Sequence, residues 1–162
     1  MTVTEAKADM DRQIAAAKKK LTDKEKEVRA KSDMAVAKCC MIIQATAVKL
    51  MRDTPPNTDV SYGKHNHHPS FPGNAPAIDY GTLMRSITFN IEDEGGKVVG
   101  YVGSTILNPP YGEYLENGTS RMKPRPWLTP AMDINRAKIK KVLFSIDKGY
   151  RLCSTCAHAR HE

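Results

Sequence analysis

A long segment without helix breakers constrains the fold of this chain most. Residues 5–32 contain neither Gly nor Pro and are rich in Ala, Lys and Glu, so they predict a long helix surrounded by water. Thr2 and Glu5 have the spacing of a capping box at its start. An apolar seam with heptad-like spacing follows the segment: Met10, Ile14, Ala17, Leu21 and Val28. Because Lys24 and Lys31 interrupt this seam, we expect a helix that docks on another surface and not a stable coiled coil.

The next segment, residues 34–51, is apolar at nearly every position. Its polar residues fall on one narrow stripe at helical spacing: Lys38, Lys49 and Arg52. We predict a helix that is covered on most sides, and another subunit is one candidate for part of that cover. Cys39 and Cys40 lie in this run and are expected to be reduced and buried as small apolar side chains.

A long irregular loop is expected at residues 53–77. Pro55 and Pro56 end the preceding helix, and further prolines and glycines follow them. The loop also contains three candidate metal ligands, which a nuclease fragment would use: His65, His67 and His68. Because no Cys, Asp or Glu stands beside them at ligand spacing, we interpret them as residues of a solvated loop.

The second half of the chain predicts a β-hairpin. Asp79 is a candidate N-cap for a helical turn over residues 79–86. Apolar and polar residues then alternate over residues 87–92, as in a strand with one buried face. Gly95-Gly96 supplies a tight reversal into a return strand over residues 98–102.

A short helix, an extended segment and a long helix are expected after the hairpin. The short helix lies between Pro110 and Gly118. Two prolines keep residues 119–127 out of a helix, and we expect this segment to run extended, as an edge strand. Thr129 and Pro130 then form an N-cap and a first helical position. The apolar face of the last helix is predicted from residues at steps of three and four: Leu128, Met132, Ile139, Val142 and Ile146.

These elements predict an α+β fold with one core, in which a small antiparallel sheet with a β-hairpin packs against two long helices, in addition to an extended N-terminal helix. The solvated N-terminal helix would occupy residues 1–32. A single α+β domain with the loop at 53–77 would follow over residues 33–150. Residues 151–162 would form a flexible C-terminal tail.

The chain is basic, with 25 Lys and Arg against 18 Asp and Glu and a formal net charge of +7. The positive residues are dispersed, and the Gly-flanked aromatic motif of an RNA-binding sheet is missing, so the charge is compatible with nearby DNA but names no partner. No run approaches the ~20 apolar residues of a membrane span, and charged residues stand near the N-terminus. We therefore expect no membrane partner and folding in the cytosol.

No catalytic motif is evident in the sequence. It lacks a phosphate-binding Gly loop, a nucleophile elbow and a His-Glu-x-x-His helix, so we predict neither catalytic residues nor a cofactor. Asp79, Glu113 and Glu116 are the carboxylates that a metal site would use, but Glu113 and Glu116 are more simply explained as residues of a solvated helix surface. The C-terminal segment offers four zinc-ligand types: Cys153, Cys156, His158 and His161. Only one residue separates the Cys pair from the first His, where about a dozen are usual, and we predict no metal site.

Two segments carry a resemblance to a known family. Residues 69–87, PSFPGNAPAIDYGTLMRSI, resemble the S-x-P-G-x-x-P-x-x-D-T-G-x-L-R-x-S-I stretch of the tail-completion, or head-tail joining, proteins of long-tailed bacteriophages and prophages. Residues 111–119, YGEYLENGT, and 124–131, PRPWLTPA, are similar to that family's Y-A-x-Y-x-E-x-G-T and P-x-P-F-L-x-P-A. The blocks follow the family's order with a hairpin between them. Three residues differ from the usual pattern: Tyr80, Met84 and Trp127.

The resemblance implies a structural protein of the virion, located at the neck or the tail end and made in the cytoplasm of a bacterial host. Proteins of that family form a homo-oligomeric ring, typically hexameric, between the head connector or stopper protein and the tail tube protein, and DNA passes transiently through the lumen. The resemblance assigns the motif residues to assembly and not to catalysis: Gly81, Leu83, Arg85, Ser86, Ile87, Tyr111, Tyr114, Glu116, Gly118, Thr119, Pro124, Pro126, Trp127, Leu128, Pro130 and Ala131.

The residues themselves leave two roles open for the Pro-rich segment 119–130. Pro124 and Pro126 would stiffen an extended arm, and Trp127 would anchor it at a subunit interface. The same residues also suit an ordinary turn packed into the protomer's own core. For the whole chain, the alternative to a virion ring is a small metal-dependent nuclease or a nucleic-acid-binding protein.

Overall fold

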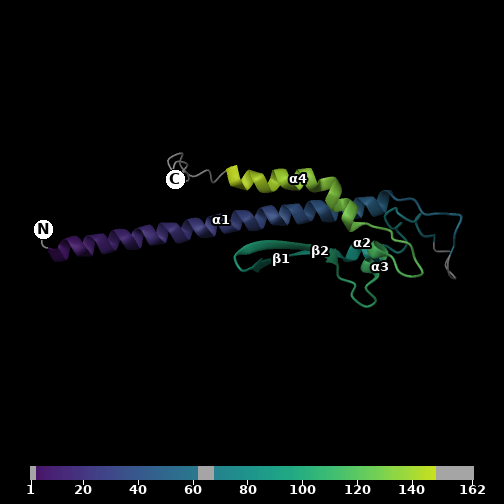
Figure 1. The fold of residues 1–162 in the computed structure, drawn as a ribbon, viewed down its shortest axis with the longest axis horizontal. Helices are drawn as coiled ribbons and strands as arrows, with labels where there is room; N and C mark the ends of the chain where they lie inside the picture. Colours follow the sequence, from purple (N-terminus) through teal and green to yellow (C-terminus); the bar gives the residue numbers. More distant parts are fainter. Residues whose placement is uncertain (1–2, 62–67, 149–162) are drawn as a thin grey trace, which may run out of the picture.

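The structure, a computed structural model, describes residues 3–61 and 68–148 and has an elongated α+β fold (Figure 1). Its elements in chain order are α1 (Val3–Asp53), α2 (Thr82–Ser86), β1 (Ile87–Glu94), β2 (Lys97–Ser104), α3 (Tyr111–Asn117) and α4 (Leu128–Lys148). The two strands pair in one antiparallel sheet beside α1, and α4 lies along another side of α1. The predicted fold class is confirmed.

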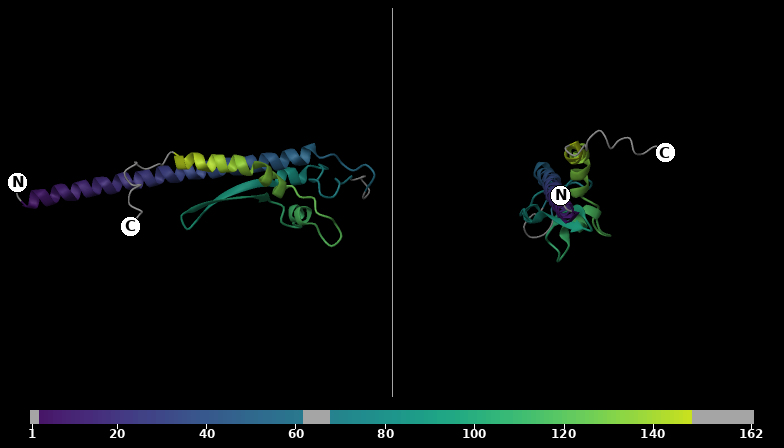
Figure 2. Two further views of the ribbon diagram at one scale, coloured as in Figure 1. Left: turned by 45° about the horizontal axis from the view of Figure 1, so that its top comes forward. Right: turned by 90° about the vertical axis from the view of Figure 1, so that its left-hand side faces the viewer.

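Helix α1 is a single helix of 51 residues. The sequence predicts a solvated helix that ends at residue 32 and an apolar helix after it, but α1 crosses this point without a break. The reason is that neither half contains a Gly or Pro that would end the helix. The two halves therefore differ only in how much of their surface other elements cover. At 1.5 Å per residue, α1 is about 77 Å long, and its N-terminal part projects beyond the other elements (Figure 2). Thr2 of the predicted capping box lies outside the described residues.

The C-terminal half of α1 is covered by α4 on one side and by the β-hairpin on another (Figure 2). Its buried positions are Ala35, Cys39, Cys40, Ile43, Ala47 and Met51. One exposed stripe remains, formed by Met34, Lys38, Met41, Ala45, Lys49 and Arg52. The prediction of a helix covered on most sides is confirmed, and in this structure the cover comes from the same chain. Cys39 and Cys40 are buried as predicted, and burial raises the pKa of both thiols.

By length and composition alone, α1 could also cross a membrane, because a window of 18 residues between Lys7 and Asp53 reaches a mean hydropathy of 1.5. Counting uninterrupted apolar residues misses this window, since Lys38 and Lys49 interrupt the run. Both lysines lie on the exposed stripe, and 28% of the window is buried in the structure. The core helix of a protein that folds in water passes the same test of length and composition.

The β-hairpin has the register that the alternating pattern predicts. Ile87, Phe89 and Ile91 are buried or half-buried, whereas Thr88, Asn90 and Glu92 are exposed. Gly95 and Gly96 form the turn with positive φ angles of 61° and 86°.

Gly100 allows the hairpin to approach α1 closely. It stands opposite Ile91 in the ladder, and a Cβ atom at this position would overlap Sγ of Cys40 and lie 2.7 Å from Cγ1 of Val36. A residue without a side chain is therefore required where the sheet meets the helix.

Helix α4 runs back along α1 (Figure 1). Ala131 and Asn135 are buried in its contact face, and Nδ2 of Asn135 donates a hydrogen bond of 2.8 Å to Oγ1 of Thr46 in α1. Met132, which the sequence predicts in this face, is 50% exposed. The prediction is wrong for Met132, whereas Leu128 and Ile139 of the same predicted face pack against the core. A pattern of large apolar residues overlooks Ala131 and Asn135, because one is small and the other is polar.

The short helix α2 begins later than predicted. Gly81 is its N-cap, with a left-handed φ of 72°, and no side chain caps the helix. Asp79 is therefore not the N-cap. Helix α3 lies between Pro110 and Gly118 as predicted.

Candidate assembly interface

The two segments that carry the family resemblance lie side by side. The backbone N–H of Gly73 donates to the carbonyl of Pro124 at 2.9 Å, and Nε of Arg125 donates to the carbonyl of Ser70 at 3.0 Å. The backbone N–H of Arg125 also donates to the carbonyl of Leu115 at 2.7 Å. Residues separated by about fifty positions in the sequence are thus joined into one unit, which we call the motif lobe and define as residues 69–87 and 111–131.

Trp127 belongs to the core of its own protomer. It is 3% exposed and packs in a cluster of buried side chains that includes Leu83, Ile87, Leu115 and Ala131. Its indole N–H donates to the carbonyl of Gly112 at 3.1 Å, so the polar atom of the ring is satisfied. Of the two roles left open by the sequence, the structure has the packed turn and not a free arm with Trp127 at its end.

Gly112 permits this packing. A Cβ at Gly112 would lie 3.3 Å from Cδ1 of Leu83 and 3.4 Å from Cζ2 of Trp127. Because the indole ring rests against bare backbone, even one added methyl group would crowd the core.

Glu116 caps helix α4 from another helix. Its Oε2 accepts hydrogen bonds from the backbone N–H groups of Trp127 and Leu128 at 2.7 and 2.9 Å, and its Oε1 accepts one from Thr129 at 2.9 Å. These N–H groups lie at the start of α4, where no carbonyl of the helix can reach them and where a negative charge is favourable. The prediction of Thr129 as N-cap is wrong, as is the interpretation of Glu116 as a residue of a solvated helix surface. The cap lies at least eleven residues away from the helix start, so local capping rules do not find it.

Glu116 should make the stability of the protein depend on pH. Burial raises its pKa, but the hydrogen bonds from Leu128, Thr129 and Trp127 outweigh burial and leave the pKa below its ordinary value of 4.5. As pH falls from near 5 through the folded pKa, the unfolded chain binds the proton first, so the contribution of Glu116 to stability is lost. Urea denaturation between about pH 6 and pH 3 should show this loss, and Glu116→Gln should reduce the slope. An unchanged slope in Glu116→Gln would contradict the role of this carboxylate.

The chain reverses direction at Gly118. Its φ is 76°, and a Cβ would lie 2.8 Å from the carbonyl oxygen of Met122 and 2.9 Å from the nitrogen of Pro124. Thr119 and Met122 form one isolated β-bridge, and Oγ1 of Thr119 accepts from the N–H of Met122 at 3.1 Å. The segment after the bridge is extended, but the predicted edge strand is wrong, because its backbone bonds to loop residues and to α3 instead of to the sheet.

The motif residues fall into three groups by exposure. The buried group is Gly81, Leu83, Ile87, Trp127 and Ala131. The half-buried group is Ser86, Glu116, Gly118, Pro126, Leu128 and Pro130. The exposed group is Arg85, Tyr111, Tyr114, Thr119 and Pro124. Most motif residues therefore build the lobe, and the exposed group is what the lobe offers to a neighbouring molecule.

A groove of about 490 Å³ lies between the two segments of the motif lobe. Pro72, Pro76 and Met122 contribute apolar surface to it, and three basic residues line it as well: Arg121, Lys123 and Arg125. Tyr111 also lines the groove, and burial, with a smaller contribution from Asp79, raises the pKa of its hydroxyl. The sequence does not indicate this groove, because its two walls come from distant segments.

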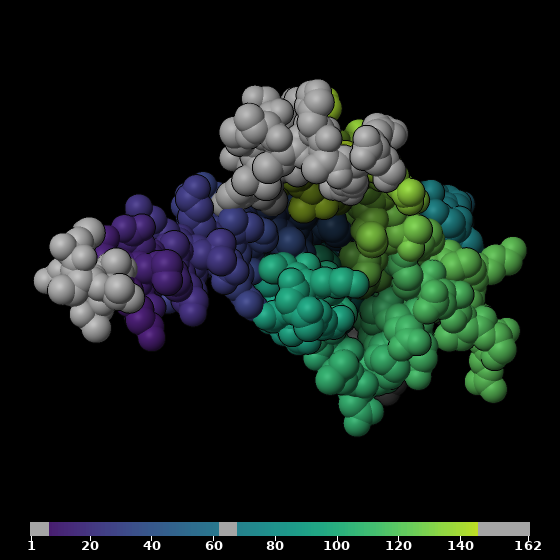
Figure 3. Space-filling view, turned by 60° about the vertical axis from the view of Figure 1, so that its left-hand side comes forward, coloured from purple at the N-terminus to yellow at the C-terminus, as the bar shows by residue number. Residues whose placement is uncertain are grey.

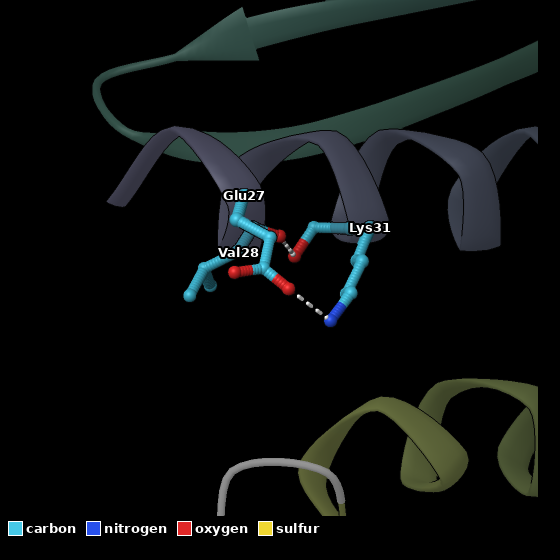
Figure 4. Close-up of polar contacts among 4 residues, drawn as sticks. Glu27, Val28 and Lys31 are labelled. Carbon is cyan, nitrogen blue, oxygen red and sulfur yellow. Dashed lines mark hydrogen bonds and ion pairs between the residues drawn. The ribbon is translucent and has the colours of Figure 1, made fainter. Parts of the chain in front are cut away.

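Apolar side chains also remain exposed on the projecting part of α1. Met10, Ile14 and Leu21 of the predicted seam are 56%, 45% and 61% exposed. Lys31, one of the residues that interrupt the seam, pairs with Glu27 at 2.6 Å on the side of α1 turned away from the hairpin (Figure 4). Met10, Ile14 and Leu21 are therefore available to a partner, whereas Val28 of the same seam is half-buried.

Within residues 3–61 and 68–148, no three His, Cys, Asp or Glu side chains are grouped so that they could hold a metal ion. Nδ1 of His68 lies 3.0 Å from the carbonyl oxygen of Val60, which gives this ring a partner in the loop. The other candidate ligands lie outside the described residues: His65, His67, Cys153, Cys156, His158 and His161.

No family model, curated protein or solved structure matches the chain. Inference about function therefore rests on the sequence motifs, the geometry of the motif lobe and the exposed surfaces.

Proposed function

We propose that this chain is a non-enzymatic structural protein of a tailed-phage virion that forms a ring at the head-tail junction or at the head-proximal end of the tail. In this role it completes the tail, contacts the head connector or stopper protein and the tail tube protein, and surrounds a lumen through which DNA passes. The homo-oligomer is a ring, with six subunits as the expected number.

The observation that supports this proposal most is that the two segments resembling the phage family, residues 69–87 and 111–131, contact each other in one lobe. Ser70 and Gly73 in the first segment bond to Arg125 and Pro124 in the second, and Leu83 packs with Trp127. Contact between the two segments is what two parts of one family-specific unit would show. The lobe thereby supports reading both segments as parts of one motif.

The exposed apolar surface also favours an assembly role. In addition to the seam on α1, the side chains of Phe71, Tyr80, Leu107 and Tyr111 are between 42% and 81% exposed. Exposed apolar surface of this extent is typical of proteins that bury it against other subunits.

Electron microscopy tests the proposal directly. The purified full-length chain should form rings in negative stain, and a phage that lacks the gene should produce heads and tails that do not join or tails with defective ends. Complementation with the intact gene should restore infectious particles. A chain that forms no ring, together with normal particles from the deletion phage, would overturn the proposal.

The geometry at Glu116 disfavours the nuclease alternative. Both oxygens of Glu116 already accept backbone N–H groups, so binding a metal ion would leave the start of α4 without its cap. A nuclease assay with magnesium or manganese provides the check. Metal-dependent activity that Glu113→Ala abolishes without unfolding the protein would revive this alternative.

A further inference from the structure

We propose that the subunit contact of the ring is formed by the outer face of one protomer's β-hairpin end, which docks in the basic groove of the motif lobe of the next protomer. This inference rests on the proposed ring and identifies the two surfaces that would build it. The occupant of the groove is a second copy of this chain.

The groove is lined by both basic and apolar side chains. Arg121 and Lys123 are exposed, and neither side chain has a hydrogen bond or ion pair to another described residue. Ser70, which also lines the groove, is 1% exposed, and its hydroxyl lacks a hydrogen-bond partner among the described residues. Among the described residues that line this groove, three are basic and none is Asp or Glu.

The hairpin end carries the complementary charge. Residues 92–94 are the only run of three consecutive carboxylates in the sequence. Asp93 faces α1, where it pairs with Arg29 and accepts the N–H of Gly96 at 2.8 Å. Glu92 and Glu94 lie on the opposite, outer face of β1, because side chains alternate along a strand.

The outer face keeps a negative charge in the protomer. Glu92 accepts a hydrogen bond from Nδ2 of Asn90 and Glu94 accepts one from the hydroxyl of Tyr101, and both of these donors are neutral. Lys97 stands opposite Glu94 in the ladder and offsets part of the charge. Tyr101, which is 46% exposed, adds an aromatic surface, so acidic and apolar groups stand together here as basic and apolar groups do in the groove.

The two surfaces lie at opposite ends of the sheet side of the molecule. The hairpin turn extends toward the N-terminal part of α1, whereas the motif lobe lies near the C-terminal end of α1 (Figures 1 and 2). Figure 3 shows the hairpin end in teal at the surface beside α1. A contact between two different surfaces of the same protein is heterologous, so each copy can bind the next in the same way. Such copies form a closed ring when the rotation that relates neighbouring subunits adds up to a full turn. Pro72, Pro76 and Met122 add apolar surface beside the basic residues, which favours a protein segment over the phosphate backbone of DNA as the occupant.

Two charge-reversed variants of the full-length chain test the contact. One is Arg121→Glu with Lys123→Glu, and the other is Glu92→Lys with Glu94→Lys. Each variant alone would place like charges together in every contact, so we expect its self-association to weaken about tenfold or more in sedimentation velocity at about 0.1 M salt. An equal mixture would pair acidic with basic surfaces at every contact in an alternating order, so assembly should return.

Matched controls and opposing outcomes separate this inference from the proposed function. Lys138→Glu with Lys140→Glu makes the same change of charge on the exposed side of α4 and should leave assembly unchanged. Rings that form equally well in both groove and hairpin variants would overturn this contact but leave the ring intact. A wild-type chain that never assembles would overturn both. A groove variant that assembles normally but loses binding to duplex DNA would show that the basic residues contact DNA, and would also overturn the inference.

Discussion

Replacing Trp127 with alanine is expected to lower the free energy of unfolding by about 3–5 kcal/mol. The ring is 3% exposed and lies in the cluster that joins α2, β1, α3 and α4, so its removal leaves a cavity among Leu83, Leu115 and Ala131. The carbonyl of Gly112 would also lose the indole N–H. Urea denaturation followed by circular dichroism measures the change, because Trp127 is the only tryptophan and its fluorescence disappears with the substitution.

Trp127→Phe is the matched control. Phenylalanine, the usual residue of the resembling family at this position, keeps a buried ring but cannot donate to Gly112, so a smaller loss of about 1–2 kcal/mol is expected. If Trp127→Ala left the free energy of unfolding unchanged but dissociated the oligomer, Trp127 would be an interface anchor and its assignment to the core would be wrong.

Glu116→Ala is expected to destabilise the chain by about 2–3 kcal/mol. The substitution removes the acceptor of three backbone N–H groups at once, at distances of 2.7, 2.9 and 2.9 Å, and it removes the negative charge at the N-terminus of α4. Because α4 packs along α1, the loss should extend beyond the first turn of α4. Chemical denaturation at neutral pH gives the free energy directly.

Glu113→Ala provides the comparison on the same short helix. Glu113 is exposed, and its replacement should change the free energy of unfolding by no more than about 0.5 kcal/mol. Equal losses for the two alanine variants would mean that the carboxylate of Glu116 contributes nothing beyond an ordinary surface charge.

Local patterns account for most of the secondary structure. The exposed stripe of α1, the alternation in β1 and the Gly95-Gly96 turn follow from spacing alone, since helices repeat every 3.6 residues and strands every two. The burial of Cys39 and Cys40 follows from the same pattern. The unbroken length of α1 was also present in the sequence, as an absence of Gly and Pro on both sides of residue 32.

The motif lobe could not be predicted in the same way. Glu116 reaches the start of α4 from a different helix, and Gly112 matters because the ring of Trp127 rests on it. The resemblance to the family identifies residues of these segments, but it does not indicate whether their side chains face the core or a neighbouring molecule. Sequence patterns describe periodicity within one helix or strand. The contacts of Glu116 and Gly112 depend instead on how different helices pack against one another.

Spacing and helix breakers in the sequence specify the class and the order of the elements, and the sequence also contains the two segments that resemble a family. The core position of Trp127, the capping role of Glu116 and the groove lined by Arg121 and Lys123 depend on tertiary packing. These two kinds of feature differ in the range of the interactions that produce them. Backbone hydrogen bonds and side-chain periodicity act over a few residues, but the lobe is held by contacts between residues up to 55 positions apart.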